Sequence, residues 1–289
     1  SRVRRPGPVT GVGRRPPPHP TPFPCEVRMI EIAPRALPAL SRWFPVGTPG
    51  PSVVGEHALA TGHGRWWTDD PEQPRALAVT CAGHASLRGD PDALTSAALA
   101  PFAHAYVDAP ARFLPLLGAA FDRLTPWERM VWTQTAAPQP STPPRGVHVR
   151  RLEPADSDAL ASLGPDSAWI AESWGGALGL AASGHGWAAV DRSGAVLAVA
   201  CAYFRGTRHE DVAVLTVPDQ RRHRLALACV IALTADIRGR GHLPSWNCST
   251  LNRASRLLAW TAGFRLVREY VHYAAGAPVE GRVPQHAAA

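Results

Sequence analysis

The sequence has 289 residues, of which 45% are hydrophobic and 18% are charged, and its formal net charge is +7. This balance is typical of a globular protein with room for two domains, and it excludes a disordered chain. The longest nearly apolar run, residues 225–235, is far shorter than the roughly 20 residues that a membrane-spanning helix needs, so a transmembrane protein is excluded.

The first segment, residues 1–24, combines five arginines and eight prolines with no acidic residue. Most of the net positive charge therefore lies in this tail rather than in the body of the chain. A segment of this composition cannot bury enough apolar surface to offset its ordering entropy, and it lacks the apolar stretch of a secretory signal. We expect a disordered, solvated extension, although an arginine-rich tail could also contact an acidic partner.

All 30 basic residues are arginine, and lysine is absent. The chain therefore cannot supply a Schiff-base lysine or the lysine of a Walker-type phosphate loop. Its five cysteines are scattered, without the paired spacing of a zinc site or the framework of a secreted domain. We expect a reduced, cytoplasmic protein without a bound metal.

Residues 25–135 alternate between helical and extended patterns, which predicts a smaller N-terminal α/β domain. Helices are predicted at 35–44, 92–100 and 110–121, and strands at 64–68, 76–82, 102–107 and 128–135. A stretch with four prolines follows at residues 136–146. Because proline removes backbone donors and favours extended geometry before it, this stretch predicts a semi-rigid linker between two domains.

Residues 147–275 predict a second α/β domain with a mixed sheet and the element order β-α-α-β-β-β-α-β-α-β. Strands are predicted at 147–152, 186–190, 195–204, 211–217, 245–247 and 264–273, and helices at 154–163, after Glu172, at 225–237 and at 253–262. The remaining residues, 276–289, are expected to form a flexible tail.

The most informative unit is a strand, a basic loop and a buried helix between Asp211 and Arg238. The loop at residues 220–224 places three arginines and a histidine at the start of the helix. Free backbone amides and the helix dipole favour anions at that point. We therefore expect a phosphate or pyrophosphate site, with a solvated basic turn as the alternative.

Residues 217–226 resemble, in register, the signature of the GNAT superfamily of acyl-CoA-dependent N-acyltransferases: a strand ending in Val-x-Pro, then R/Q-x-x-G-x-G/A opening a helix. The superfamily's second pattern, N-x-x-[AS]-x-x-L-x(4)-G-F, matches Asn252, Ser255, Leu258, Gly263 and Phe264. The resemblance is firm over 147–275 and loose over 25–135. The chain is similar to the branch of the superfamily in which a smaller domain precedes the catalytic domain.

The resemblance implies splayed central strands, with the backbone of the strand at 214–217 pairing with the pantetheine of acetyl-CoA or another acyl-CoA. It implies acyl transfer by direct attack of a small-molecule amine on the thioester. We expect no bound metal, no membrane partner and no specific nucleic-acid partner. The identity of the acceptor and the oligomeric state stay open. The residues that it assigns to the co-substrate are Leu215, Thr216, Val217, Gln220, Arg221, Arg222, His223, Arg224, Leu225, Ala226 and Asn252.

Two arginines depart from the family pattern, because Arg222 and Arg224 occupy positions that are usually glycine. If the backbone needs a positive φ at Arg224, the residue would be strained by roughly 1–3 kcal/mol. Its side chain could also occupy the position of the phosphate group. Alternatively, either arginine could hold phosphates by bidentate contacts with nearly helical backbone geometry. We expect phosphate binding.

The candidate general base is Asp211, which stands where the family often has a glutamate at the start of this strand. Glu210, a second catalytic candidate, lies beside it on the opposite face of the strand. A carboxylate there would take the proton of the attacking ammonium, although a solvent-facing acid is the alternative.

The family's tyrosine acid is replaced here by Ala259. Either no acid is used, or the substitute is Tyr270, Tyr203, Tyr273 or Cys248, of which we select Tyr270; a structural role is the alternative. Two further functions stay open: a catalytically silent binding module, and an aminoacyl-tRNA-dependent transferase of related fold.

Overall fold

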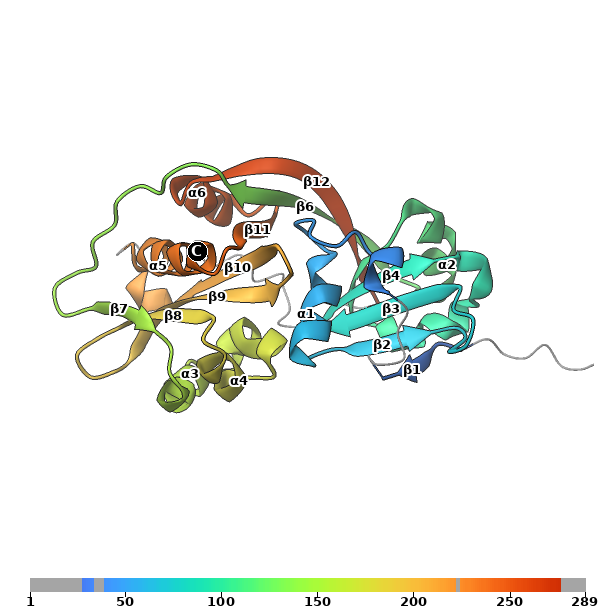
Figure 1. Cartoon of the computed structure of the whole chain (residues 1–289), viewed down its shortest axis with the longest axis horizontal. Helices are drawn as coiled ribbons and strands as arrows, with labels where there is room; N and C mark the ends of the chain where they lie inside the picture. The colour runs from blue at the N-terminus through green and yellow to red at the C-terminus, as the bar shows by residue number, and fades with distance from the viewer. Residues whose placement is uncertain (1–27, 34–38, 222–223, 277–289) are drawn as a thin grey trace, which may run out of the picture.

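The computed structural model describes residues 28–33, 39–221 and 224–276 (Figure 1). The predicted tail at 1–24, the loop residues Arg222 and His223, and all but the first residue of the predicted tail at 276–289 lie outside these ranges. None of the helices in the described ranges is both long and apolar enough to cross a membrane.

The described residues form a twelve-stranded mixed sheet with the order β1-β2-β3-β4-β5-β12-β6-β11-β10-β9-β8-β7. Neighbouring strands are antiparallel except for the pairs β4–β5 and β10–β11, which are parallel. The strands are β1 (Ile30–Ile32), β2 (Arg65–Thr68), β3 (Ala76–Cys81), β4 (His84–Gly89), β5 (Tyr106–Asp108), β6 (Leu124–Gln134), β7 (His148–Arg151), β8 (Gly186–Val190), β9 (Val196–Arg205), β10 (His209–Thr216), β11 (Leu243–Ser249) and β12 (Phe264–Ala275).

Helices cover both faces of the second half of the sheet. Helices α5 and α6 lie on one face and α3 and α4 on the other (Figure 1). The α-helices are α1 (Val53–Thr61), α2 (Leu114–Ala120), α3 (Ser157–Ala161), α4 (Ala177–Ala182), α5 (Leu225–Gly239) and α6 (Arg253–Thr261). The 3-10 helices are η2 (Leu40–Arg42), η3 (Pro91–Ala93), η4 (Ser96–Phe102), η5 (Ala111–Phe113), η6 (Pro154–Asp156), η7 (Pro165–Trp174) and η8 (Pro218–Gln220).

Strands β6 and β12 connect the two halves, and both arch over the junction in Figure 1. Strand β6 precedes the predicted linker, yet it lies between β11 and β12 of the second half, and β12 in turn pairs with β5 of the first half. The sheet therefore continues across the predicted boundary. The division into domains at 25–135 and 147–275 stays a prediction.

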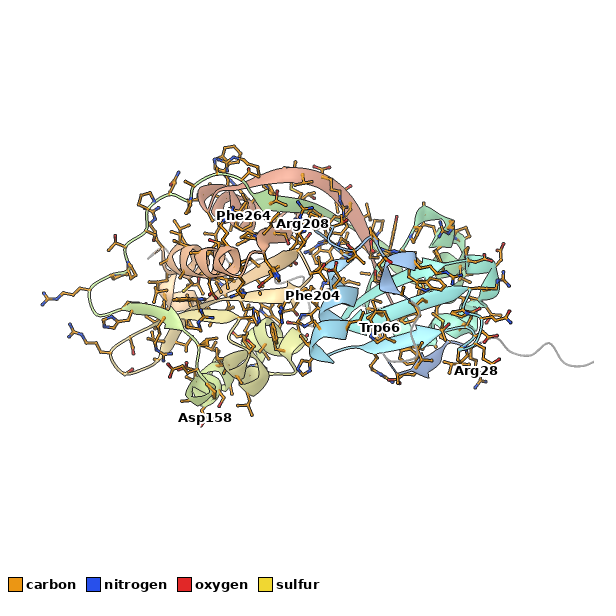
Figure 2. The ribbon with its side chains drawn as sticks, viewed as in Figure 1. Arg28, Trp66, Asp158, Phe204, Arg208 and Phe264 are labelled. Atoms are coloured by element: carbon orange, nitrogen blue, oxygen red, sulfur yellow. The ribbon has the colours of Figure 1, made fainter. Side chains whose placement is uncertain are left out.

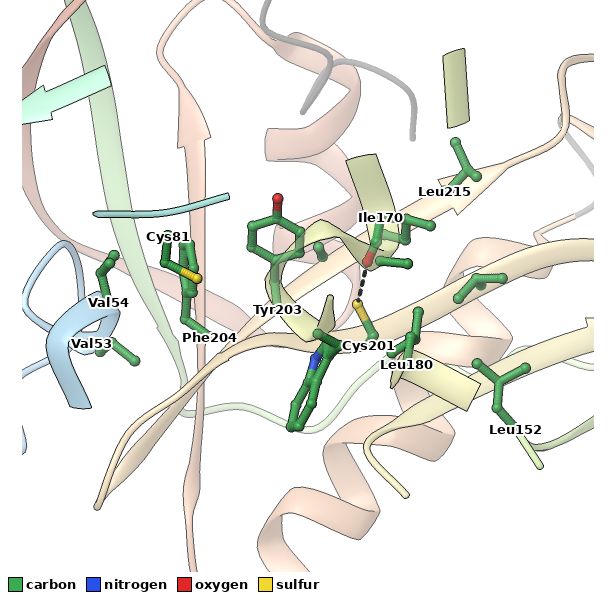
Figure 3. Close-up of a cluster of buried hydrophobic side chains, with 14 of the residues drawn as sticks. Val53, Val54, Cys81, Leu152, Ile170, Leu180, Cys201, Tyr203, Phe204 and Leu215 are labelled. Carbon is green, nitrogen blue, oxygen red and sulfur yellow. Dashed lines mark hydrogen bonds between the residues drawn. The ribbon is translucent and has the colours of Figure 1, made fainter. Parts of the chain in front are cut away.

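A shared apolar core fills the junction between the halves. Figure 3 shows Val53 and Val54 of α1 and Cys81 of β3 beside Tyr203 and Phe204 of β9. In the view of Figure 2, Phe204 lies between Trp66 of the first half and Phe264 of the second. Because the two halves bury apolar side chains against each other, they pack as one body.

The second half follows the predicted order of elements, with ends shifted by a few residues. The turn between β8 and β9 is stabilised by the Asp191 carboxylate, which accepts hydrogen bonds from the Ser193 and Ala195 amides at 2.8 and 3.0 Å. The helix predicted after Glu172 forms as α4, which begins only at Ala177. Two glycines with positive φ, Gly175 and Gly176, separate it from η7.

Predictions for the first half are less accurate. The strands predicted at 64–68, 76–82 and 128–135 and the helix at 110–121 are confirmed as β2, β3, β6, and η5 with α2. The α-helix predicted at 92–100 is wrong. The chain instead forms η3 and η4, because Thr95 between them is extended and Pro101 interrupts the second.

Two further elements of the first half differ from the prediction. Residues 39–44 of the helix predicted at 35–44 contain the three-residue η2 rather than an α-helix, and residues 34–38 lie outside the described ranges. The strand predicted at 102–107 begins only at Tyr106. The sequence pattern also missed α1 and β4, since most of their residues are buried and the polar face that marks an element is missing.

Candidate active site

Strands β10 and β11 separate after a short parallel ladder. Their paired residues run from His209–Leu243 to Val212–Trp246. Beyond that point, within the described residues, β10 pairs with β9 alone and β11 with β6 alone. The two strands thus form a wedge whose vertex lies near Asp211. The splay that the family resemblance implied is confirmed, and one backbone edge of residues 213–216 faces the opening.

A pocket of about 400 Å³ lies at the open end of the wedge, where β10 ends and α5 begins. Its walls come from β10, the basic loop, the first turn of α5 and one side of α6. They comprise Thr216, Gln220, Arg221, Arg224, Leu225, Ala226, Leu227, Ala254, Leu257, Leu258 and Thr261. Six residues predicted to bind the co-substrate therefore come together here. The first amides of a 15-residue helix and two arginines suit an anionic group.

Thr216 gives the pocket an unsatisfied polar atom. Its side chain is 4% exposed, and its hydroxyl has no hydrogen-bond partner among the described residues. Buried polar groups are normally hydrogen-bonded, because leaving one unsatisfied is costly. A ligand with polar groups in this pocket would satisfy the hydroxyl, so the residues present fit the pantetheine and phosphates of acetyl-CoA.

Three other predicted co-substrate residues lie differently. The Leu215 side chain belongs to the core on the opposite face of the sheet, so only its backbone can reach the wedge. The Val217 amide donates to the Leu197 carbonyl at 3.0 Å. Asn252 caps α6, its Oδ1 accepting from the Ser255 amide at 3.0 Å, and its role toward a ligand stays a prediction.

Arg224 adopts left-handed backbone geometry, with φ 58° and ψ 19°. Its carbonyl accepts from the Ala228 amide at 3.1 Å, within the first turn of α5, and from the Ser141 hydroxyl of the linker at 3.2 Å. The prediction of nearly helical geometry at this residue is wrong, because the chain must turn sharply before α5. An L-residue with a side chain is strained in this conformation, which explains why glycine would suit the position.

Asp211 lies at the vertex of the wedge and is 9% exposed. Its Oδ1 accepts a hydrogen bond from Asn247 Nδ2 at 2.7 Å. Burial raises the pKa of Asp211 to about 7, although the Asn247 hydrogen bond and the Arg129 charge act in the opposite direction. A carboxyl group that titrates near neutrality is suited to accept a proton during a reaction.

Tyr270 and Arg129 extend this polar cluster across the sheet. The Tyr270 hydroxyl accepts from Arg129 Nε at 3.1 Å and donates to Asn247 Oδ1 at 3.4 Å. Burial raises the pKa of Tyr270 to about 12, partly offset by the Arg129 charge. The guanidinium of Arg129 stacks on the Trp127 ring at 4.0 Å. Strands β6, β12, β11 and β10 thus each contribute one member of the chain Arg129–Tyr270–Asn247–Asp211.

The sequence prediction did not identify Arg129 or Asn247 as site residues. Both stand in otherwise largely apolar strand segments, Arg129 before Met-Val-Trp and Asn247 between Trp246 and Cys248. A charged or amide side chain inside such a run is the one signal that could have revealed them, since buried polar groups need partners.

Glu210 does not join this cluster. It is fully buried, with Arg240 Nε and Nη2 at 3.1 and 2.7 Å and His242 Nδ1 at 2.8 Å. Burial alone would raise its pKa, but the Arg240 hydrogen bonds and charge, together with His185 Nδ1 at 3.5 Å, outweigh burial and lower the pKa to about 2. Glu210 is therefore ionised and fully engaged, and it is poorly placed to act as a base.

The described ranges contain no group of three or more histidine, cysteine and acidic side chains that could hold a metal ion. The described cysteines, Cys81, Cys201, Cys229 and Cys248, are free and buried.

Comparisons with known proteins agree with this geometry. A family model described as GNAT acetyltransferase matches residues 141–273. The chain is 60% identical over 214 residues to an uncharacterised N-acetyltransferase of the mutA 5′ region of Streptomyces virginiae, which spans 74% of this chain and 90% of that protein.

Two solved structures share the fold. The GCN5-related N-acetyltransferase-like protein from Streptococcus suis has a TM-score of 0.58 at 18% identity, covering 78% of this chain and 93% of that one. The GNAT-family acetyltransferase from Colwellia psychrerythraea has a TM-score of 0.54 at 12% identity, covering 86% and 99%. The predicted fold class, an α/β chain with a mixed sheet and splayed central strands, is confirmed.

Proposed function

Since the chain belongs to the GNAT acetyltransferase family and is an acyltransferase, we propose that it transfers an acetyl group from acetyl-CoA to a small-molecule amine by direct attack. One observation carries the proposal: the wedge between β10 and β11 has a pocket lined by Arg221 and Arg224 at its open end and Asp211, a carboxyl group with a raised pKa, at its vertex.

The chain's own groups suit each part of the co-substrate. The amides of the first turn of α5, with Arg221 and Arg224 beside them, would hold the phosphates. The free edge of residues 213–216 would pair with the pantetheine amides, and the Thr216 hydroxyl would gain a partner. Bound in this way, acetyl-CoA supplies an activated acyl group as a thioester at the vertex.

Asp211 would take a proton from the ammonium group of the acceptor, which frees the nitrogen lone pair for attack. Its raised pKa favours this role, because a base is most effective when its pKa lies near the working pH. Asn247 would hold the carboxylate in a fixed orientation through the 2.7 Å hydrogen bond. Catalysis would then combine a positioned base with a positioned thioester.

Tyr270 is the candidate acid for the departing thiolate. Its hydroxyl keeps its proton at neutral pH because burial raises the pKa to about 12. The Arg129 guanidinium, whose Nε lies 3.1 Å from the hydroxyl oxygen, would stabilise the tyrosinate that remains after donation.

Calorimetric titration of the purified chain with acetyl-CoA tests the proposal. We expect saturable binding with a micromolar Kd, followed by release of free CoA when a suitable amine is added. A folded protein that binds no acetyl-CoA would contradict the proposed function.

A further inference from the structure

Arg129 is a buried cation that forms no ion pair with a carboxylate of the described residues. It is 2% exposed, its Nε donates to Tyr270, and its Nη1 has no hydrogen-bond partner among the described residues. The Trp127 ring covers one face of the guanidinium. Because an uncompensated buried charge is strongly destabilising, a chain that keeps one needs a function for it.

The guanidinium and the candidate base lie on the same face of the sheet. Arg129 pairs with Ser249 on β11 and with Tyr270 on β12, while Asn247 pairs with Val131, two residues along β6. Side chains alternate along a strand, so these residues share one face. The intervening Met130 and Cys248 belong to the core beneath α5 and α6 on the other face.

Neither of the two carboxyl groups near this cluster forms an ion pair with Arg129 within the described residues. Asp211 is hydrogen-bonded to Asn247 instead, at 2.7 Å. The other acid that affects Tyr270 is Asp108, and Arg88 already pairs with that carboxylate. Trp127 and Tyr270 are only half-buried, so the cluster borders solvent at these two side chains.

We propose that Arg129 binds an acidic group of the acceptor, so that the acceptor is an amine that also carries a carboxylate, as an amino acid does. The inference rests on the proposed function, since it names the substrate of that reaction. A guanidinium forms strong, directional hydrogen bonds with a carboxylate. With the carboxylate held at Arg129, the amine extends past Tyr270 and Asn247 toward Asp211, and both ends of the acceptor are fixed.

Matched pairs of amines test the proposal on the intact protein. The pairs are 4-aminobutyrate with propylamine, phenylalanine with phenethylamine, and β-alanine with ethylamine, so that each amine lacks only the carboxylate. Binding is measured by calorimetry with saturating CoA, and transfer from acetyl-CoA is measured by thiol release. For at least one pair, we expect the carboxylated member to be favoured by roughly 10- to 150-fold, as for a hydrogen bond to a charged group.

The variant Arg129→Gln should remove this preference and leave acetyl-CoA affinity unchanged. Arg265 provides the matched control: it also stacks on a tryptophan, Trp260, at 3.8 Å, but outside the site, so Arg265→Gln should keep the preference. If Arg129→Gln does not fold, Arg129→Lys is used in its place, because it keeps the positive charge. The comparison of the matched amines on the wild-type protein then decides whether the inference holds.

Two results would overturn the inference. The first is that no pair shows an advantage for the carboxylated member, including the case in which no amine of the panel binds. The second is that Arg129→Gln weakens both members of a pair equally, which would reduce Arg129 to positioning Tyr270. Failure of the proposed function is a separate result, because acetyl-CoA itself would then not bind.

Discussion

The two ends of the wedge between β10 and β11 are built in different ways. Apart from one side of α6, the open end is built from a single stretch of the chain: the last residue of β10, the basic loop and the first turn of α5. It offers backbone amides and the exposed side chains of Arg221 and Arg224. The vertex is buried and consists of side chains from four strands that are far apart in the chain. Binding of the co-substrate and proton transfer are therefore assigned to structurally separate regions, which substitutions can test one at a time.

Substitution of Asp211 by Asn should have the largest effect. It keeps the size of the side chain but removes the proton acceptor, and loss of a general base typically lowers the rate roughly 10²- to 10⁴-fold. The defect should shrink as the pH rises, since free amine then forms without help. Acetyl-CoA affinity should stay near wild type because the vertex does not contact the phosphates. Equal rates for the variant and wild type from about pH 6.5 to 9 would remove Asp211 from the mechanism.

Substitution of Glu210 by Gln compares this residue with its neighbour Asp211 on β10. Loss of this charge leaves Arg240 and His242 without their partner, so the free energy of unfolding should fall by roughly 3 kcal/mol, the low end for a broken buried pair because Asp236 still contacts Arg240. The pH dependence of kcat should keep its wild-type shape.

The sign of the pH effect on stability follows from the lowered pKa of Glu210, about 2 against the ordinary value of 4.5. The stabilisation is complete above the ordinary value and is lost as the pH falls through 4.5 towards 2. Urea unfolding of wild type and variant at neutral and acidic pH measures it. A difference in stability that does not shrink in acid would contradict the assigned ion pair.

Removal of the Arg221 side chain should affect binding and leave the chemical step intact. In Arg221→Ala we expect roughly tenfold weaker acetyl-CoA binding, as for one lost hydrogen bond to a charged group, with kcat near wild type at saturation. Arg253, on α6 but outside the pocket wall, offers the control Arg253→Ala, which should bind normally. A change in kcat without a change in affinity would mean that Arg221 acts on the chemical step, and would contradict the assignment of binding to the open end and of proton transfer to the vertex.

The smallest effect is expected at Arg224. Both Arg224→Gly and Arg224→Ala remove the guanidinium, but only glycine relieves the left-handed conformation at φ 58°. The glycine variant should therefore be more stable than the alanine variant by about 1 kcal/mol. Thermal unfolding of the two measures the difference. Equal melting temperatures would mean that the loop is not strained at this residue.

The two ends also differ in how far the sequence could predict them. The open end was predictable because strand, loop and helix follow one another, and a short pattern contains the charges, the apolar helix and the spacing to Asn252. The second half of the fold was predictable for the same reason, since glycines, prolines and apolar periodicity mark its elements locally.

The vertex was only partly predictable, because it depends on strand pairing at long range. Asp211 and Tyr270 could be selected, but Arg129 enters the site only because β6 lies between β11 and β12, and no local pattern encodes that placement. Glu210 has a lowered pKa and Asp211 a raised one. Their surroundings also depend on remote partners, Arg240 for the first and Asn247 for the second. Strand alternation predicted their opposite directions and nothing more.

A crystal structure of the chain with acetyl-CoA tests the central claim most directly. We expect the phosphates at the first turn of α5, the pantetheine along residues 213–216 between β10 and β11, and the thioester beside Asp211. Acetyl-CoA bound outside this wedge, or in the wedge with its thioester remote from Asp211, would contradict the account.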